Sequence, residues 1–434
     1  MNTKNERETT IDILIEILEG EAFNNLALRR TLDNSAHLTL HQKAFVTEVV
    51  NGVLRNLGLI DHIIGSVSSV KIKKMRPFVR NSLRSAVYQL LFMKSSADFA
   101  VCSETVDLIK KRGMTSLSGF VNGVLRNIIR NKDSISFPDE SKSPVEFLSV
   151  KYSVPNWLVE MWIDDFGYEK AKRMCEINNT PPSVTLCVNT LLTTTENLTK
   201  KLIACGTEVK KLENFPNALK VSKLSGIAEM PEFVKGEFHV MDESAMFAVK
   251  ALDPKPGENV LDICAAPGGK SFFSAYKMKN NGKIVSNDIF NHKAALIKSG
   301  AKRLKIEIIE ATTIDAAKEC AEFINKFDKV LVDAPCTGFG VVRKKPDIKL
   351  TKTENSQKEM SELQRKILEQ AAKYVKSGGK LVYSTCTLTK DENENNAAWF
   401  KDNFDFELVS EQTILPQDYD SDGFYVARFI RIEK

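Results

Sequence analysis

The sequence lacks any long apolar run. No stretch of its 434 residues approaches the roughly 18 uncharged apolar residues that a membrane-spanning helix needs. Its first ten residues, MNTKNERETT, are polar and charged where a secretory signal has an apolar core. These absences predict a protein that stays in the cytoplasm.

Closely spaced metal ligands are also missing. The eight cysteines form no CxxC pair and the five histidines are dispersed, whereas zinc sites and disulfide frameworks need clustered ligands or dense cysteines. We therefore expect reduced thiols, no disulfide and no bound metal. The shares of 43% hydrophobic and 27% charged residues are typical of a globular protein, and the length predicts about three domains.

Two common phosphate-binding motifs are incomplete in CAAPGGKS, residues 264–271. A Walker loop has the pattern GxxxxGK[ST], and Cys264 stands at its leading glycine. A dinucleotide-binding loop requires GxGxxG, which residues 265–268 do not supply. The small residues and the helix expected after them still allow backbone N–H groups to approach a ligand closely.

What the first third of the chain does contain is helical periodicity. From Thr9 to about Arg130, apolar residues recur every three or four positions with no alternating strand pattern, which predicts an all-helical domain over residues 1–140. The string VNGVLRN occurs at 50–56 and again at 121–127, either as two similar helical corners of one bundle or by coincidence.

Positive charge is concentrated in the same region, because residues 1–150 carry a net charge of +4 and the remaining 284 residues only +1. The densest part, KIKKMRPFVRNSLR at residues 71–84, holds six lysine and arginine residues: Lys71, Lys73, Lys74, Arg76, Arg80 and Arg84. This run predicts either a phosphate-binding surface or a solvated helix face.

The rest of the chain predicts two further domains. A segment rich in Ser, Asp and Lys at 131–150 indicates an exposed linker, and helices followed by strands at SVTLCVNTL, TEVKKLE and ALKVSK predict a small α+β domain over residues 141–236. From 237 to 434, repeated strand and helix units with seven strands predict an α/β, Rossmann-like, doubly wound parallel sheet. Its longest helix is expected over residues 356–379, ending at Gly378 and Gly379.

Acidic residues follow several of these strands. Asp288 lies twenty residues after Gly268, where a carboxylate can accept both hydroxyl groups of a ribose. Asp262, Asp315 and Asp333 are expected at the same edge of the sheet, and four carboxylates favour a cationic ligand over a pyrophosphate unless magnesium intervenes. S-adenosylmethionine, a sulfonium with a ribose, fits this charge; the alternative is that each aspartate only caps a helix.

Four segments of this domain occur in a distinctive order: VLDICAAPGGKS, DAPCTGFGVVRKKPDIK, YSTCTLTKDENE and DGFYVARF. They resemble the successive motifs of the RNA cytosine-5 methyltransferases. The helical first domain, with FVNGVLRNIIR, resembles the NusB-like RNA-binding domain of one branch, the RsmB (Sun or Fmu) ribosomal small-subunit RNA methyltransferases. The resemblance spans nearly the whole chain. It implies that a cytoplasmic monomer methylates carbon 5 of a cytosine in 16S ribosomal RNA, giving 5-methylcytidine.

The same resemblance implies which residues line the S-adenosylmethionine: Cys264, Ala265, Ala266, Pro267, Gly268, Gly269, Lys270, Asp288, Asp315 and Asp333. Asp288 would bind the ribose and Asp315 would lie near the adenine, although an alignment shifted by three residues would place Thr312 there. Asp333 begins the Asp-Ala-Pro-Cys signature beside the methyl group. Cys187 and Met241 stand where the family usually has arginine and glutamine, on the substrate side.

Two cysteines, Cys336 and Cys386, are expected at the ends of neighbouring strands. Carbon 5 of cytosine is too weak a nucleophile to attack a sulfonium methyl group, and addition of a thiolate to carbon 6 activates it. In DNA methyltransferases the cysteine after proline attacks, which would nominate Cys336. The resemblance to the RNA enzymes implies Cys386 as nucleophile, with Cys336 assisting product release and Asp333 hydrogen-bonding the base. The alternative is a pair of buried cysteines without a chemical role.

The substrate and two rival functions complete these expectations. A cytosine must leave its stack for a thiol to reach carbon 6, which favours a loop or an unfolded RNA. A non-catalytic RNA-binding or antitermination factor would use the helical domain and need no cofactor. A DNA methyltransferase normally has a target-recognition region after its catalytic motifs, whereas only 48 residues follow Cys386.

Overall fold

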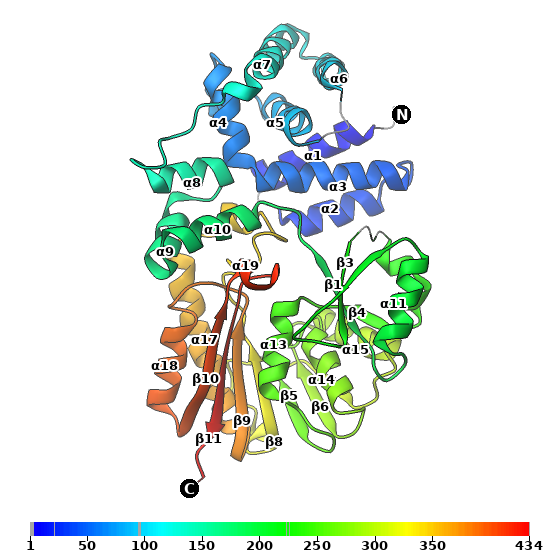
Figure 1. Cartoon of the computed structure of the whole chain (residues 1–434), viewed down its shortest axis with the longest axis vertical. Helices are drawn as coiled ribbons and strands as arrows, with labels where there is room; N and C mark the ends of the chain where they lie inside the picture. The colour runs from blue at the N-terminus through cyan, green and yellow to red at the C-terminus, as the bar shows by residue number, and fades with distance from the viewer. Residues whose placement is uncertain (1–3, 21, 94–96, 223, 225, 434) are drawn as a thin grey trace. The chain divides into compact units, whose positions relative to one another are not determined.

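The protein divides into two compact units (Figure 1). The structure is a computed structural model that describes residues 4–20, 22–93, 97–222, 224 and 226–433. One unit comprises Met1–Thr180 with Val342–Thr351, and the other comprises Pro181–Val341 with Lys352–Lys434. Over these described ranges, no helix is long and apolar enough to cross a membrane.

The described residues of the first unit form helices joined by turns and loops and no strand, as the periodicity predicts. Its α-helices are α1 (Glu6–Gly20), α2 (Asn24–Asp33), α3 (Leu40–Arg55), α4 (Leu57–Val67), α5 (Pro77–Phe92), α6 (Asp98–Lys111), α7 (Ser118–Asn131), α8 (Pro144–Tyr152), α9 (Asn156–Phe166), α10 (Tyr168–Asn178) and α16 (Ile348–Thr351). A capping box between Thr39 and Gln42 starts α3. One apolar core joins α1, α3 and α5 through the buried side chains of Leu14, Val53 and Leu83.

Two sequence interpretations of this unit are wrong. Residues 144–150, expected as part of an exposed linker, lie in α8, in which Phe147 and Leu148 are buried, because proline in the first turn is compatible with a helix start. The two VNGVLRN strings are not similar corners. The string at 50–56 ends α3 and stops at Asn56, the residue before α4, whereas the string at 121–127 lies inside α7.

The basic run at 71–84 contains two kinds of cation, paired and unpaired. Arg80 pairs with Glu19 at 2.6 Å, and the buried Arg84 pairs with Asp61 at 2.6 Å. These two arginines therefore hold helices together. The four cations of residues 71–76 are exposed and form no ion pair with any residue in the described ranges. They remain available as a solvated surface.

The helical unit also contains a segment from late in the chain, residues 342–351. Lys349 is buried, and its Nζ donates to the backbone oxygen of Arg55 at the end of α3, at 2.7 Å. A carboxylate oxygen of Asp347 accepts from the backbone nitrogen of Asn24 at 3.3 Å. Burial lowers the pKa of Lys349 to about 7.

We expect Lys349→Met to change how stability varies with pH. Between about pH 7 and the ordinary lysine pKa of 10.5, the unfolded chain binds more protons than the folded chain, so this group makes the free energy of unfolding rise with pH. The difference in the free energy of unfolding between wild type and variant should change by about 1.4 kcal/mol per pH unit in this pH range. Chemical denaturation in a Trp399→Phe background measures it, because Trp157 and Trp162 then report on this unit alone. Parallel profiles for the two proteins would contradict the prediction.

The second unit begins with a four-stranded antiparallel sheet in the order β2-β3-β1-β4. Its elements are β1 (Val184–Val188), α11 (Thr195–Ala204), β2 (Glu208–Lys211), β3 (Ala218–Ser222), α12 (Pro231–Val234) and β4 (Phe238–Val240). The three strands predicted from SVTLCVNTL, TEVKKLE and ALKVSK are confirmed, and β4 completes the sheet. Cys187 in β1 and Met241 after β4 are buried in an apolar core, so neither side chain faces solvent.

A seven-stranded sheet in the order β10-β11-β9-β8-β5-β6-β7 forms the rest of this unit. Its elements are α13 (Glu243–Leu252), β5 (Asn259–Asp262), α14 (Gly269–Lys277), β6 (Lys283–Asn287), α15 (Asn291–Arg303), β7 (Ile309–Thr312), β8 (Phe327–Asp333), α17 (Asn355–Tyr374), β9 (Val375–Thr385), α18 (Glu394–Asn403), β10 (Phe406–Ile414), α19 (Pro416–Tyr419) and β11 (Phe424–Arg431). All seven predicted strands are present. The expected all-parallel arrangement is wrong, because β11 runs antiparallel to both of its neighbours.

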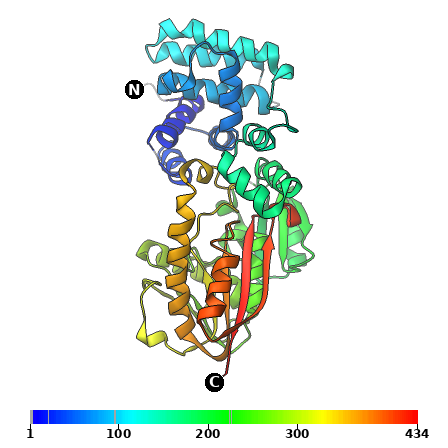
Figure 2. The same cartoon turned by 90° about the vertical axis from the view of Figure 1, so that its left-hand side faces the viewer.

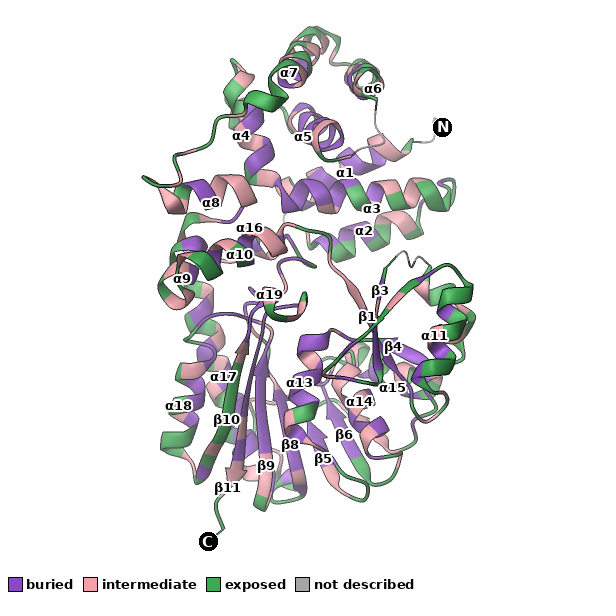
Figure 3. Cartoon of the chain, viewed as in Figure 1, coloured by how far each residue is buried: buried purple, intermediate pink, exposed green. Residues whose placement is uncertain are grey.

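Helices cover both faces of this sheet. Successive strand residues point to opposite faces, so Val260 and Leu331 pack with α13, α14 and α15, whereas Leu261 and Val330 pack with α17 and α18. Figure 2 shows α17 and α18 together over one face. Figure 3 shows buried residues along the central strands and exposed residues along the edge strand β10.

The long helix α17 ends five residues earlier than the sequence predicts. It stops at Tyr374, and Gly378 and Gly379 lie inside β9. Val375 already pairs with Phe327 of β8, and the ladder shifts register before it resumes at Lys380. The glycines therefore belong to an irregular strand entry, where Gly378 has a φ of +69°, and do not cap the helix.

Candidate active site

The predicted site residues meet at one edge of the seven-stranded sheet. Strands β5, β8 and β9 are adjacent and parallel, and they end at Asp262, Asp333 and Thr385. Because the carboxyl ends of parallel strands open at the same edge, the loops after these strands share one site. Cys336 and Cys386 lie in two of these loops.

The two thiols are in direct contact. The Sγ atoms of Cys336 and Cys386 are 3.2 Å apart, and both cysteines are partly buried and form no disulfide bond. The hydrogen bond to Cys386, followed by burial, raises the pKa of the Cys336 thiol well above its ordinary value. Cys336 therefore keeps its proton and can donate a hydrogen bond to the sulfur of Cys386.

Backbone contacts hold the two thiol loops against each other. The N–H of Gly340 donates to the backbone oxygen of Cys386 at 3.0 Å, and the N–H of Gly423 donates to the backbone oxygen of Gly340 at 2.8 Å. A Cβ atom on Gly340 would lie 2.1 Å from the carbonyl oxygen of Gly423. Only glycine permits this approach, which explains the glycine that follows the first thiol by four positions.

A buried carboxylate, Glu392, fixes the loop that carries Cys336. Glu392 accepts hydrogen bonds from the backbone N–H of Thr337 at 2.9 Å, from the Thr337 hydroxyl group, and from the side-chain amide of Gln364 at 2.9 Å. Gln364 also donates to the backbone oxygen of Pro335 at 2.9 Å. Both neighbours of Cys336 are thus held. Burial raises the pKa of Glu392, although these hydrogen bonds oppose the shift.

A lysine and a carboxylate lie beside the thiols. Lys270 donates to Asp333 at 2.6 Å, and the hydroxyl group of Ser384 donates to the other oxygen of Asp333 at 3.0 Å. Burial on its own would lower the pKa of Lys270, but the charge of Asp333 and its hydrogen bond outweigh burial and raise it. The Lys270 side chain is therefore a cation, and Asp333 is oriented from two sides.

The glycine loop after β5 leads directly into α14. Gly268 has a φ of +110°, and a Cβ atom there would lie 2.5 Å from the Phe272 ring, so the turn requires glycine. At Gly269, the first residue of α14, a Cβ atom would lie 3.9 Å from the side chains of His239 and Met241, an ordinary contact distance. The loop therefore leads into the positive end of a helix, where backbone N–H groups can bind a ligand.

Asp262 lies beneath the glycine loop with an unused hydrogen-bonding atom. Its Oδ2 accepts from the Ser271 hydroxyl group at 2.7 Å, while its buried Oδ1 has no partner among the described residues. Burial, with smaller contributions from the charges of Asp333 and Asp288, raises its pKa to about 7. Burial also raises the pKa of Cys264, so this thiol keeps its proton and does not compete as a nucleophile.

Asn287, which the sequence analysis did not single out, organises the loops after β5 and β7. Its buried side-chain amide donates to the backbone oxygens of Ile263 and Ile314 at 3.0 and 2.9 Å. Its carbonyl oxygen accepts from the backbone N–H of Ile314 and from the hydroxyl group of Thr312. The sequence signal for this residue is its position directly before Asp288, the aspartate expected at the end of a strand.

The remaining predicted residues lie at the ends of β6 and β7. Asp288 follows β6, is buried, and has Lys293 Nζ at 3.6 Å. Asp315 follows β7, accepts from the N–H of Ala317 at 3.1 Å and is partly exposed. Thr312, the alternative to Asp315, already uses its hydroxyl group on Asn287. The carboxylates after β5, β6 and β8 surround the glycine loop, and this charge suits a cationic, ribose-bearing ligand.

Three family models match consecutive parts of the chain. They are the NusB family over residues 4–130, the ferredoxin-like domain of RsmF/B-like methyltransferases over residues 154–227, and the 16S rRNA methyltransferase RsmB/F over residues 249–430. A protein of Bacillus subtilis (strain 168) named "Probable ribosomal RNA small subunit methyltransferase B" is 38% identical over 445 residues, with 98% of each chain covered. The chain belongs to the RsmB methyltransferase family.

Solved structures agree with this membership of the RsmB family. The crystal structure of PH0851 covers 100% of both chains with a TM-score of 0.81 and 30% identity. A methyltransferase homologue from Pyrococcus horikoshii covers 67% of this chain and 99% of its own, with a TM-score of 0.58 and 28% identity. The predicted fold class is confirmed: a NusB-like helical domain, a small α+β domain of ferredoxin-like type and a Rossmann-like methyltransferase domain.

Proposed function

We propose that this protein transfers a methyl group from S-adenosylmethionine to carbon 5 of a cytosine in small-subunit (16S) ribosomal RNA. A transient bond between Cys386 and carbon 6 of the base activates the ring. The observation that carries the proposal is the contact of two thiols 3.2 Å apart beside the Lys270 and Asp333 pair. The names of the RsmB relatives support small-subunit ribosomal RNA as the substrate. The cytoplasm is the proposed place of action.

The residues around the glycine loop fit S-adenosylmethionine. Residues Cys264 to Lys270 would line it, Asp288 would bind its ribose and Asp315 would lie near its adenine. The unpartnered buried oxygen of Asp262 supports this fit, because a cation would satisfy it. When bound, this cofactor supplies an electrophilic methyl group.

Cys386 supplies the nucleophile. Its thiolate forms a bond to carbon 6 of the cytosine, and the electron pair of the C5–C6 double bond moves so that carbon 5 becomes nucleophilic. After carbon 5 is methylated, it loses its proton to a base, the C5–C6 double bond re-forms and the sulfur–carbon bond breaks. The expelled sulfur returns to its place beside the protonated Cys336, which stabilises it by hydrogen bonding.

Asp333 and Lys270 position the base and stabilise charge. Asp333 holds the end of β8 beside the thiols and is itself oriented by Ser384, so it is preorganised to hydrogen-bond the cytosine ring. The Lys270 ammonium group, kept protonated by Asp333, provides positive charge near the thiolate of Cys386. The groups that bind the cofactor, supply the thiolate and bind the cytosine therefore lie at the ends of three adjacent strands, β5, β8 and β9.

The affinity for S-adenosylmethionine should depend on pH through Asp262. Burial raises the pKa of this carboxyl group to about 7, so below this value it is protonated, and a cationic ligand favours its ionised form. The dissociation constant should fall up to about tenfold per pH unit as pH rises toward 7, and then level off. Calorimetry from about pH 5.5 to 8.5 measures this, with Asp262→Asn expected to bind weakly and independently of pH. A wild-type affinity that is flat over this range would contradict the prediction.

Mapping of 5-methylcytidine tests the function itself. Small-subunit ribosomal RNA from cells without this gene should lack one 5-methylcytidine that is present in cells with it, and purified protein with S-adenosylmethionine should restore it. Unchanged maps would overturn the proposal. Absence of S-adenosylmethionine binding by calorimetry would instead favour the non-catalytic RNA-binding function.

A further inference from the structure

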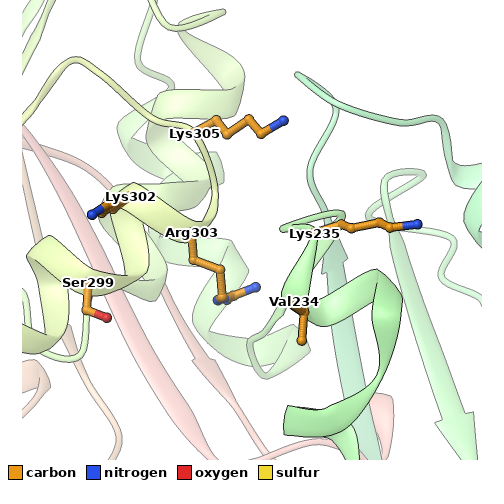
Figure 4. Close-up of a pocket in the computed structure, with 6 residues that line it drawn as sticks. All are labelled: Val234, Lys235, Ser299, Lys302, Arg303 and Lys305. Carbon is orange, nitrogen blue, oxygen red and sulfur yellow. The ribbon is translucent and has the colours of Figure 1, made fainter.

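A basic pocket lies at the far end of helix α15 from Asp288. It has a volume of about 570 Å³ and is lined by Val234, Lys235, Ser299, Lys302, Arg303 and Lys305. Figure 4 shows residues of the end of α15 on one side and Val234 and Lys235, from the end of α12, on the other. Because α15 has 13 residues, about 20 Å of helix separates the pocket from the end that bears Asp288.

The two walls of this pocket are tied together by buried contacts. The side-chain amide of Asn189, which is fully buried, donates to the backbone oxygens of Gly236 and Leu304 at 2.9 and 2.8 Å. Gly236 has a φ of +80°, and a Cβ atom there would lie 2.2 Å from the backbone oxygen of Arg303. The pocket is therefore preformed, and its shape does not depend on a ligand.

Arg303 forms the floor between these walls. Its guanidinium group donates to the backbone oxygens of Phe233 and Phe238 at 2.7 and 3.1 Å and lies over the Phe233 ring at 3.8 Å. These partners are neutral, so its positive charge is held in place and not neutralised.

Three lysines around Arg303 have no partner of their own. Lys235, Lys302 and Lys305 are exposed and form no ion pair or side-chain hydrogen bond with any residue that the structure describes. Nearby Lys201, by contrast, pairs with Glu237 at 2.6 Å. The pocket lining thus contains four cations and no carboxylate, and a bound anion would reduce their mutual repulsion.

Compensation of the helix dipole explains only part of this arrangement. Cations in the last turn of a helix stabilise it, which accounts for Lys302 and Arg303. It does not account for Lys235, which comes from a different element. Lys305 has a left-handed φ of +55° just beyond the helix, where glycine or asparagine is usual. A lysine here is conformationally unfavourable, and its charge gives a reason for it.

We propose that this pocket binds backbone phosphate groups of the RNA substrate, away from the target cytosine. Lysine ammonium groups on flexible stems bind phosphates as point charges, and they read no sequence. The pocket would therefore hold the strand in register while a single base enters the thiol site. The identification of the polyanion as RNA rests on the proposed function.

The test compares three lysine substitutions with a matched control. The full-length variant Lys235→Gln/Lys302→Gln/Lys305→Gln and the control Lys326→Gln/Lys366→Gln/Lys401→Gln lose the same charge, and the control lysines are also exposed. Binding of a single-stranded fragment of small-subunit ribosomal RNA is titrated over a range of salt concentrations. The pocket variant should bind about tenfold more weakly near 0.1 M salt, with the slope of log K against log salt reduced by about 2, since each phosphate contact contributes about 0.7. Its turnover at saturating RNA and its S-adenosylmethionine affinity should match wild type.

An unchanged salt slope in the pocket variant would overturn the proposal. An equal loss in the control variant would overturn it too, because it would indicate an effect of bulk charge alone. The single variant Lys235→Gln controls for misfolding, because Lys235 lies outside any helix. It should reduce the salt slope by about 0.7. Competition by inorganic phosphate with no effect of the substitutions on RNA binding would indicate a small-anion site and would also overturn it. If RNA binding depends on the pocket but no 5-methylcytidine forms, the proposed function fails and the RNA-binding site stands.

Discussion

Cys386→Ala should abolish methylation and leave no covalent complex with RNA, whereas Cys336→Ala should leave the enzyme trapped on its RNA. The first variant lacks the sulfur that bonds to carbon 6, so its activity should fall by at least about 10³-fold. The second keeps the attacking sulfur and loses the protonated thiol 3.2 Å away, so the bond forms normally but release is slow.

Denaturing electrophoresis of each variant with labelled RNA and S-adenosylmethionine measures the covalent complex. Cys336→Ala should shift a large fraction of the protein to the mass of an RNA adduct. The double variant should show no adduct, because Cys386 acts before Cys336. Cys205→Ala, an exposed cysteine outside the site, should behave as wild type. An adduct with Cys386→Ala and none with Cys336→Ala would reverse the two roles.

The fold could be predicted from local patterns to a large extent. Helical periodicity and strand runs depend on which face of each element is buried, and this information is local in sequence. The seven strands and the thiols at neighbouring strand ends follow from it. The direction of β11 does not, because strand direction depends on the connections around it and not on the strand's own pattern.

The residues that hold the site in shape are only weakly indicated by the sequence. Glu392 and Asn287 act through hydrogen bonds to backbone groups 24 to 55 residues away, and such contacts produce no periodic pattern in the sequence. The path of residues 342–351 into the helical unit was also unpredicted. Lys349, a charged side chain that is nearly always exposed, is buried there.

Glu392→Ala should disable the site without removing any group that touches the substrates. The carboxylate accepts from Thr337, Gln364 and the hydroxyl group of Thr389. Its loss leaves several buried donors without an acceptor, which should lower the free energy of unfolding of the catalytic unit by about 3 kcal/mol. The loop of Cys336 should then move relative to Cys386, and formation of the covalent complex should slow by about 10²-fold.

The readout that separates positioning from general damage is the rate of adduct formation in a Cys336→Ala background. Glu392→Ala should reduce this rate while the affinity for S-adenosylmethionine stays within about twofold of wild type, because the glycine loop, Lys270 and Asp262 do not depend on Glu392. Glu392→Gln keeps the shape and one carbonyl oxygen, so it should recover part of the rate. Glu362→Ala, on the exposed face of α17, is the matched control. An unchanged rate of adduct formation in Glu392→Ala would show that the two thiols hold their contact without this carboxylate.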